Sequence, residues 1–304
     1  MKGRLQICNI PLHFYIKTLK GGIFYKIEDM ILYFTIYSCR LRELKDIKVI
    51  GFTLMFNHIH SLELSKYAKT LGTLHKLSER DFSREYNAEY GISGHLFDRP
   101  YGFAAKRIAK KVRECETYIA NNPVAGKLCN EPCEYRWNLL AYYNNDNPYS
   151  KVINRHSISK AMRESINTVD IYSGRNKHLN YASQRRIFQG LNKEERLQIT
   201  DYIISKYNFL DYDETIKLFG SYEKALTTFQ ANAGAEYELP DDNDDYSIYR
   251  KMSGIMKELG YSVDCKTIST LSDRDIRRIS QVFFERLNAA NFQICKFLRL
   301  LSRS

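Results

Sequence analysis

The sequence lacks long apolar runs, paired cysteines and glycine-rich phosphate-binding loops. Its longest apolar segment, from Met30 to Tyr37, is far too short to span a bilayer. The first residues show neither the sustained apolar stretch nor the small-residue cleavage site of a signal peptide, so we expect a cytoplasmic protein with no membrane partner. Neither G-x-x-x-x-G-K followed by Ser or Thr nor G-x-G-x-x-G occurs, and we therefore expect no nucleotide cofactor.

The seven cysteines are scattered without paired spacing, which is typical of reduced thiols in a cytosolic protein. Cys129 and Cys133 stand four apart, but no second Cys/His pair follows at zinc-finger spacing. Packing at a helix end is therefore the preferred interpretation of these two residues. We expect no disulfide framework.

The chain carries an excess of positive charge, with 46 Lys and Arg against 35 Asp and Glu and a formal net charge of +11. This balance suits a polyanionic partner, nucleic acid before a membrane surface, although many soluble proteins are basic without binding either. The length of 304 residues exceeds that of one average domain and predicts two domains. Hydrophobic residues make up 44% of the chain, which is ample for a buried core.

The order of the predicted elements is typical of an α+β protein. Leu12 to Lys17 predicts a short strand, and Glu28 to Lys45 predicts an amphipathic helix. Ile47 to Leu64 is rich in β-branched and aromatic residues and predicts two strands, with a hairpin or bulge at Gly51. A further helix is predicted from about Phe103 to Ala120. This β-α-β-β-α order indicates an antiparallel sheet packed against helices.

A polar segment, NNDNPYS from Asn144 to Ser150, is the clearest candidate for a linker. We therefore predict a first domain over residues 1–145, an irregular linker over residues 146–190 and a mostly α-helical region over residues 191–304. Asn192 and Glu195 form a capping-box pattern near the start of that region. The final FERLNAANFQICKFLRLLSRS is typical of part of a helix-turn-helix that stops before its recognition helix, so packing against the first domain is its favoured role.

A pair of histidines, His58 and His60, lies in the second predicted strand region. Residues two apart on a strand point to the same face, so the two imidazoles can converge on one metal ion. An H-x-H also occurs often by chance, and the pair alone does not establish a metal site.

About sixty residues later, Tyr118 and Asn122 stand four apart and share one face of the predicted helix, which we expect Pro123 to close. A basic segment leads to Tyr118 and could hold a phosphate backbone beside a tyrosine nucleophile. In isolation, a core tyrosine next to a solvated lysine face would be the commoner arrangement. The basic residues are Lys106, Arg107, Lys110, Lys111 and Arg113.

Three segments, in this order, resemble the REP-associated tyrosine transposases, which belong to the single-tyrosine HUH superfamily. They are LMFNHIHSLEL, YGISGHLFDRPYG, and YIANNPVAGKLC followed by YRWNLLAY, and the resemblance covers Ile10 to Tyr143. One departure is Phe56, which stands where the family usually has proline before the Asn-His of its HUH strand. The resemblance implies a ferredoxin-like antiparallel sheet with helices on one face.

The resemblance also implies the roles of four residues. His58 and His60 would be metal ligands, Asn122 the third ligand and Tyr118 the nucleophile. Mg²⁺ or Mn²⁺ suits such a ligand set. The implied reaction cleaves and rejoins single-stranded DNA at hairpin-containing sites through a 5′-phosphotyrosine ester, without ATP. The implied partner is a single-stranded DNA hairpin, bound in the nucleoid by a monomer or a homodimer.

Two other interpretations remain open at this point. The chain could be a domesticated, non-transposing protein that binds hairpin DNA or RNA on the same fold. It could also be a non-catalytic interaction protein in which His58, His60 and Tyr118 are structural. The intact tyrosine and histidines favour activity over the first, and the coincidence of three motifs disfavours the second.

Overall fold

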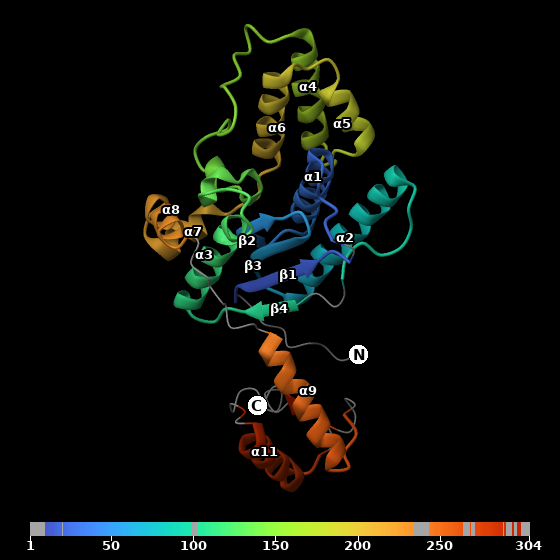
Figure 1. Ribbon diagram of the computed structural model, residues 1–304, viewed down its shortest axis with the longest axis vertical. Coiled ribbons are helices and arrows are strands. Elements are labelled where there is room, and N and C mark those ends of the chain that lie inside the picture. Colours follow the sequence, from blue (N-terminus) through green and yellow to red (C-terminus); the bar gives the residue numbers. More distant parts are fainter. Residues whose placement is uncertain are drawn as a thin grey trace. The chain divides into compact units, whose positions relative to one another are not determined.

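The computed structural model describes residues 10–19, 21–98, 102–233, 243–263 and 271–287, together with residues 268, 289, 294, 297 and 298. The chain divides into two compact units, residues 1–237 and 238–304. The first unit contains a sheet and helices, and the described part of the second contains helices (Figure 1).

Four antiparallel strands form the sheet of the first unit, in the order β2-β3-β1-β4. The elements are β1 Leu12–Lys17, α1 Ile27–Leu44, β2 Ile47–Leu54, β3 His58–Ser65, α2 Ala68–Tyr90 and β4 Gly102–Ala105. Their β-α-β-β-α-β order with β1 and β3 in the centre is the ferredoxin-like arrangement. The predicted α+β class and antiparallel sheet are therefore confirmed. The pairing of β2 with β3 shifts register between Val49 and Gly51, so the predicted bulge is present, with Ile50, the residue before the glycine, as the extra residue.

Helices cover both faces of this sheet, rather than one. Phe14 and Ile59 belong to the main core, which they share with α1 and α2. Leu62 is fully buried against the opposite face, where α3 (Ala109–Ala125) packs. Ile59 and Leu62 are three apart on β3 and therefore point to opposite sides, and both are apolar, so each face needs its own cover. The side chains that α3 supplies are Val112, Cys115 and Ile119.

The helix that carries Tyr118 begins later and ends later than the sequence predicts. Gly102–Ala105 pairs with β1 as an edge strand, and α3 starts at Ala109. It continues through Pro123 to Ala125. A proline has no N–H for the carbonyl four residues earlier. Here the Thr53 hydroxyl donates to that carbonyl, Ile119 O, at 2.8 Å, which lets the helix pass the proline.

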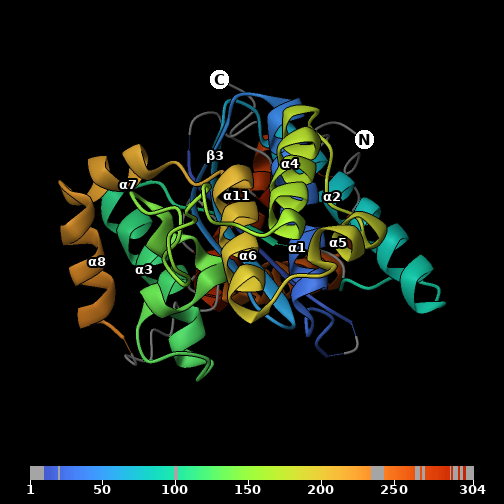
Figure 2. The same cartoon turned by 90° about the horizontal axis from the view of Figure 1, so that it is seen from above.

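The helices after the sheet belong to the same unit. Two of them, α4 Lys160–Gly174 and α5 Tyr181–Phe188, lie within residues 146–190, so the predicted irregular linker is wrong. They and α6 Lys193–Tyr207 contribute buried residues to the core that contains α1, and the three helices lie beside α1 (Figure 2). The predicted capping box at Asn192 and Glu195 is present. The last two described helices of the first unit are α7 Tyr212–Phe219 and α8 Tyr222–Ala231, and both pack against α3.

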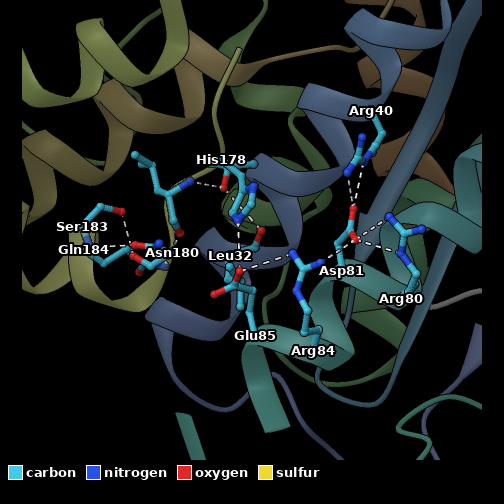
Figure 3. Close-up of polar contacts among 12 residues, drawn as sticks. Leu32, Arg40, Arg80, Asp81, Arg84, Glu85, His178, Asn180, Ser183 and Gln184 are labelled. Atoms are coloured by element: carbon cyan, nitrogen blue, oxygen red, sulfur yellow. Dashed lines mark hydrogen bonds and ion pairs between the residues drawn. The ribbon is translucent and has the colours of Figure 1, made fainter. Parts of the chain in front are cut away.

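Ionic contacts connect α1 with α2 around a buried carboxylate. Figure 3 shows Arg40 and Arg80 converging on Asp81: Arg40 Nε donates to Asp81 Oδ2 at 2.9 Å, and Arg80 Nη2 donates to Oδ1 at 2.8 Å. Burial opposes the charge of Asp81, but the guanidinium donors of Arg80 and Arg40 outweigh it and lower the pKa of this carboxyl. Nε2 of His178, a residue just before α5, lies 3.7 Å from Oε1 of Glu85 on α2 (Figure 3). These contacts join early and late segments of the unit.

The second unit has a core of its own. Its described helices are α9 Asn243–Glu258 and α11 Asp273–Leu287, and Met252, Met256 and Phe283 are fully buried in their cluster. The predicted helical character of the C-terminal region is confirmed for the described residues. Most of the predicted helix-turn-helix-like end, after Leu287, lies outside them. In the part of the chain that the structure describes, no helix is long and apolar enough to cross a membrane.

Candidate metal and tyrosine site

β3 presents His58 and His60 on the face of the sheet that α3 covers. Asn122, in the last turn of α3, lies between them: its Oδ1 is 2.8 Å from His58 Nε2, and its Nδ2 is 3.3 Å from His60 Nε2. The structure therefore brings together the three residues predicted as metal ligands. Two ligand atoms in neighbouring positions around an octahedral Mg²⁺ or Mn²⁺ are about 3 Å apart. The spacing of 2.8 Å between His58 Nε2 and Asn122 Oδ1 is close to that separation, whereas the 3.3 Å contact at His60 is made by the amide nitrogen, which is not a metal ligand.

The cluster consists of two imidazoles and one amide. Among the described residues, no group of three or more His, Cys, Asp or Glu side chains is arranged to hold a metal ion. A neutral set of nitrogen and oxygen donors binds a hard divalent cation weakly, and phosphate oxygens that complete the coordination would strengthen the binding. Such a site would favour a cation that arrives with, or is held by, a phosphate.

Both histidines are kept neutral by their surroundings. Burial lowers the pKa of His58, the contact with Asn122 partly opposes it, and the charge of Lys17 adds to the lowering. The pKa of His60 lies well below its usual value because the ring is buried and because His13 and His58 are close. Neutral imidazoles have a lone pair on one ring nitrogen, which is the form that binds metals.

The Nδ1 atom of each ring has a hydrogen-bond partner, so the Nε2 atom of each ring is the one that faces a possible ligand site. His58 Nδ1 is 2.7 Å from Asn57 Oδ1, and His60 Nδ1 is 3.0 Å from His13 Nε2. If each Nδ1 carries the proton, both Nε2 lone pairs face Asn122. Both ring nitrogens of His58 face amide oxygens, and a neutral ring can donate to just one of them. Either a cation near Nε2 or a 180° turn of the Asn122 amide would resolve that conflict.

Three residues of this arrangement were missed by the sequence analysis. His13 and Tyr15 lie on β1, which pairs with β3 so that Tyr15 is opposite His60. The ring of Tyr15 stacks on His60 with centroids 4.6 Å apart, and that of His13 does so at 5.1 Å. Asn57 is the third. The alternation of His13, Tyr15 and Lys17 in the predicted first strand was the signal, but the register that joins it to β3 was not predicted.

Tyr118 lies one turn before Asn122 on α3 and is half-buried. The edge of its ring faces His60, with centroids 5.2 Å apart and planes at 83°, and it faces His13 in the same manner at 6.1 Å. The predicted nucleophile is therefore beside the predicted ligands. Residues four apart on a helix share a face, which explains why Tyr118 and Asn122 reach the same histidines.

The five predicted basic residues do not share one exposed helical face. The helix begins at Ala109, so Lys106 and Arg107 do not lie on it, and Lys106 is buried. Arg107 and Lys110 are exposed. Lys111 is exposed and forms an ion pair with Glu114 at 2.7 Å, and Arg113 is half-buried. The single basic helical face expected from the sequence is thus divided between the segment before α3 and its first turns.

Comparisons with protein-family models and with curated proteins find no match to this chain. Its structure is similar to a solved structure of a REP-associated tyrosine transposase bound to a REP hairpin. The TM-score is 0.35 and the sequences are 13% identical, over 46% of this chain and 81% of the other. At this level of similarity, function is inferred from the side chains of the site.

Proposed function

We propose that this protein is an HUH-type endonuclease or transposase that cleaves and rejoins single-stranded DNA through an ester on Tyr118. One observation carries the proposal: Nε2 of His58, Nε2 of His60 and the amide of Asn122 converge beside the Tyr118 ring. The cluster thus joins two candidate metal ligands of β3 to a third candidate ligand and the candidate nucleophile, which share one face of α3.

His58, His60 and Asn122 would hold Mg²⁺ or Mn²⁺, which when bound would polarise the scissile phosphate and stabilise the developing negative charge. Asn57 and His13 would fix the ring orientation of the two histidines by accepting from their Nδ1–H groups. The distance of 2.8 Å between His58 Nε2 and Asn122 Oδ1 supports this assignment, because two ligands of one Mg²⁺ or Mn²⁺ ion can lie about that far apart.

The Tyr118 hydroxyl would attack phosphorus, forming a bond from the phenol oxygen to phosphorus and breaking the bond to the 3′ oxygen. The phenol loses its proton, and the departing 3′ oxygen takes one up. The product is a 5′-phosphotyrosine, whose ester conserves the energy of the broken bond. Attack by a 3′-hydroxyl on this ester then joins strands without ATP.

The proposed substrate is single-stranded DNA with a hairpin. Arg107 and Lys110 are exposed around the start of α3. When such side chains bind phosphates, counterions are released from the DNA, which favours binding at low salt. Lys111 would do so at the expense of its ion pair with Glu114. The proposed binding is therefore salt-dependent.

The test is covalent capture. Wild-type protein, Mn²⁺ and end-labelled single-stranded hairpins are run on a denaturing gel, and we expect a labelled protein–DNA adduct. Tyr118→Phe keeps the ring and deletes the attacking oxygen, so it should bind DNA and form no adduct. His58→Ala with His60→Ala should also abolish it while binding stays within about tenfold.

Tyr67→Phe is the matched control, since Tyr67 is an exposed tyrosine after the other end of β3, and its adduct yield should equal that of wild type. An adduct in Tyr118→Phe would show that another tyrosine is the nucleophile. Hairpin binding by wild type without an adduct on any strand, with Mg²⁺ or Mn²⁺, would favour the domesticated binding protein.

A further inference from the structure

Two aromatic side chains are exposed at the turn that leads into His58. Tyr25 is 71% exposed and Phe56 36%, and their rings stack with centroids 6.1 Å apart and planes at 28°. Phe56 precedes His58 by two residues, within the turn that joins β2 to β3. Exposed apolar side chains that cluster beside a polar site indicate ligand contact more than solitary ones do.

The pair is held in place by the backbone of two loops. Met55 N donates to His58 O at 2.9 Å and closes the turn that contains Phe56. The carbonyl of Phe56 accepts from Ile23 N at 2.9 Å and from Phe24 N at 3.1 Å, which fastens the loop of Tyr25 to that turn. A preformed aromatic surface loses little conformational entropy when a ligand stacks on it.

A glycine makes room for this arrangement. The Tyr25 ring lies over Gly22, where a Cβ would be 2.5 Å from the ring carbon Cζ. Any larger residue at position 22 would displace the ring. The ring is therefore supported from beneath by backbone, while most of its surface faces solvent.

The surroundings favour a nucleobase as the occupant. Asn57, the next residue after Phe56, contacts His58 Nδ1, so the turn that carries the aromatic ring also orients a proposed ligand. Lys17 is exposed and lies opposite His58 in the strand register. An aromatic surface next to a cation and a phosphate site matches the base and backbone of an unpaired nucleotide.

We propose that Tyr25 and Phe56 form a stacking platform for an unpaired base of the strand that carries the scissile phosphate. The proposal rests on the function proposed above and adds a base-binding subsite to it. The platform would hold the strand extended across the His58–Asn122 cluster. It would also define which phosphate lies beside Tyr118.

The test places 2-aminopurine at successive unpaired positions of a hairpin strand and measures its fluorescence with full-length protein and Mg²⁺. We expect strong quenching at one position, because an aromatic ring stacked on the base quenches it. Tyr25→Leu with Phe56→Leu keeps apolar bulk but removes both rings. It should abolish that quenching and weaken binding about tenfold or more.

Two further variants separate stacking from folding. Phe56→Tyr retains a ring and should retain the quenching. Tyr67→Leu removes an exposed aromatic ring beyond the far end of β3 and should leave both signals unchanged. An abasic nucleotide at the quenched position should weaken wild-type binding by the same factor as the double variant. Combining the two changes should then have no additional effect.

The proposal is overturned if the double Leu variant quenches and binds like wild type, or if wild type binds no single-stranded DNA. Its failure is distinguishable from that of the proposed reaction. Quenching that depends on the two rings, together with no adduct at Tyr118, would support the platform and refute the cleavage. If the double Leu variant forms the adduct equally well at the same phosphate, and no quenching depends on the two rings, the result would support the cleavage and refute the platform.

Discussion

The ring of His60 has a partner at each nitrogen, and the two partners come from opposite sides. His13 Nε2 is 3.0 Å from Nδ1, and Asn122 Nδ2 is 3.3 Å from Nε2. A proton on Nδ1 donates to His13 and leaves Nε2 with its lone pair. Free imidazoles have no such fixed preference, so we expect His13, when it accepts this proton, to leave Nε2 of His60 available to the proposed metal.

His13→Phe is predicted to weaken Mn²⁺ binding about 10–100-fold, because an aromatic ring remains at position 13 but the acceptor for His60 Nδ1–H is lost. Titration calorimetry with the metal alone measures the affinity. Nitrogen-15 chemical shifts of His60 in metal-free protein should show the proton moving from Nδ1 toward Nε2. His156→Phe, at an exposed histidine, is the control. Unchanged shifts in His13→Phe would refute this role.

At the scale of elements, α3 is held from both sides. Its apolar face packs on the sheet, and its opposite side meets α7 and α8. The Asn121 amide donates to Phe229 O of α8 at 2.8 Å, and Thr215 of α7 donates to Glu116 at 2.6 Å. Glu116 is two residues before Tyr118, so this contact joins α7 to the part of α3 that carries the proposed nucleophile.

Glu116 is predicted to make the stability of the first unit fall as the pH rises. Burial raises its pKa from 4.5 to about 8, and the Thr215 hydrogen bond only partly opposes this. Between these values the folded state keeps a proton that the unfolded state has lost, so unfolding becomes more favourable with increasing pH. The loss is about 3 kcal/mol between pH 5 and 8 and ends above the folded-state pKa.

Glu116→Gln should remove most of this dependence, because the amide stays neutral in both states. Urea unfolding at pH 5 and at pH 8 measures the free energies of both proteins. Glu164→Gln, at a largely exposed carboxylate of α4, should retain the wild-type dependence. The same pH dependence in wild type and Glu116→Gln would mean that Glu116 is ionised in the folded protein.

Local periodicity explains which parts of the site the sequence could predict. His58 and His60 share a face because a strand repeats every two residues, and Tyr118 and Asn122 share one because a helix repeats every 3.6. His13 required the pairing of β1 with β3, which no local pattern specifies. The four-residue edge strand after position 101 has no β-branched residue and was predicted as helix.

The ends of α3 show the same limit at the level of an element. Pro123 predicts a helix end because its own N–H is missing. The helix continues because Thr53, seventy residues earlier in the chain, supplies a hydroxyl to the carbonyl left without a donor. A side chain from a neighbouring strand thus supplies the donor that the proline lacks, and sequence periodicity does not contain that information.

At the scale of the molecule, the sheet and the helices after it share one core. Ile166, Val169 and Ile203 are buried with residues of α1 in a single cluster. Polar contacts also connect the later segments to α1: the Leu179 amide donates to Thr35 Oγ1 at 3.1 Å, and the Tyr181 hydroxyl donates to Asp29 Oδ1 at 2.6 Å. The polar segment near Asn147 is therefore a surface connection within one unit. Polarity and Asn-Pro predict a turn, but they do not predict whether the core continues beyond it.

This continuity predicts where the chain can be cut. A fragment of residues 1–149 would lack α4, α5 and α6 and expose the apolar side of α1 that they cover, so we expect it to aggregate or to show no cooperative unfolding. A fragment of residues 1–237 retains the whole first unit. It should unfold cooperatively and bind Mn²⁺ with the affinity of the full chain. Thermal unfolding followed by circular dichroism, with calorimetry for the metal, compares the two fragments. Cooperative folding of residues 1–149 would show that the helices after Asn147 pack on a core that is already complete.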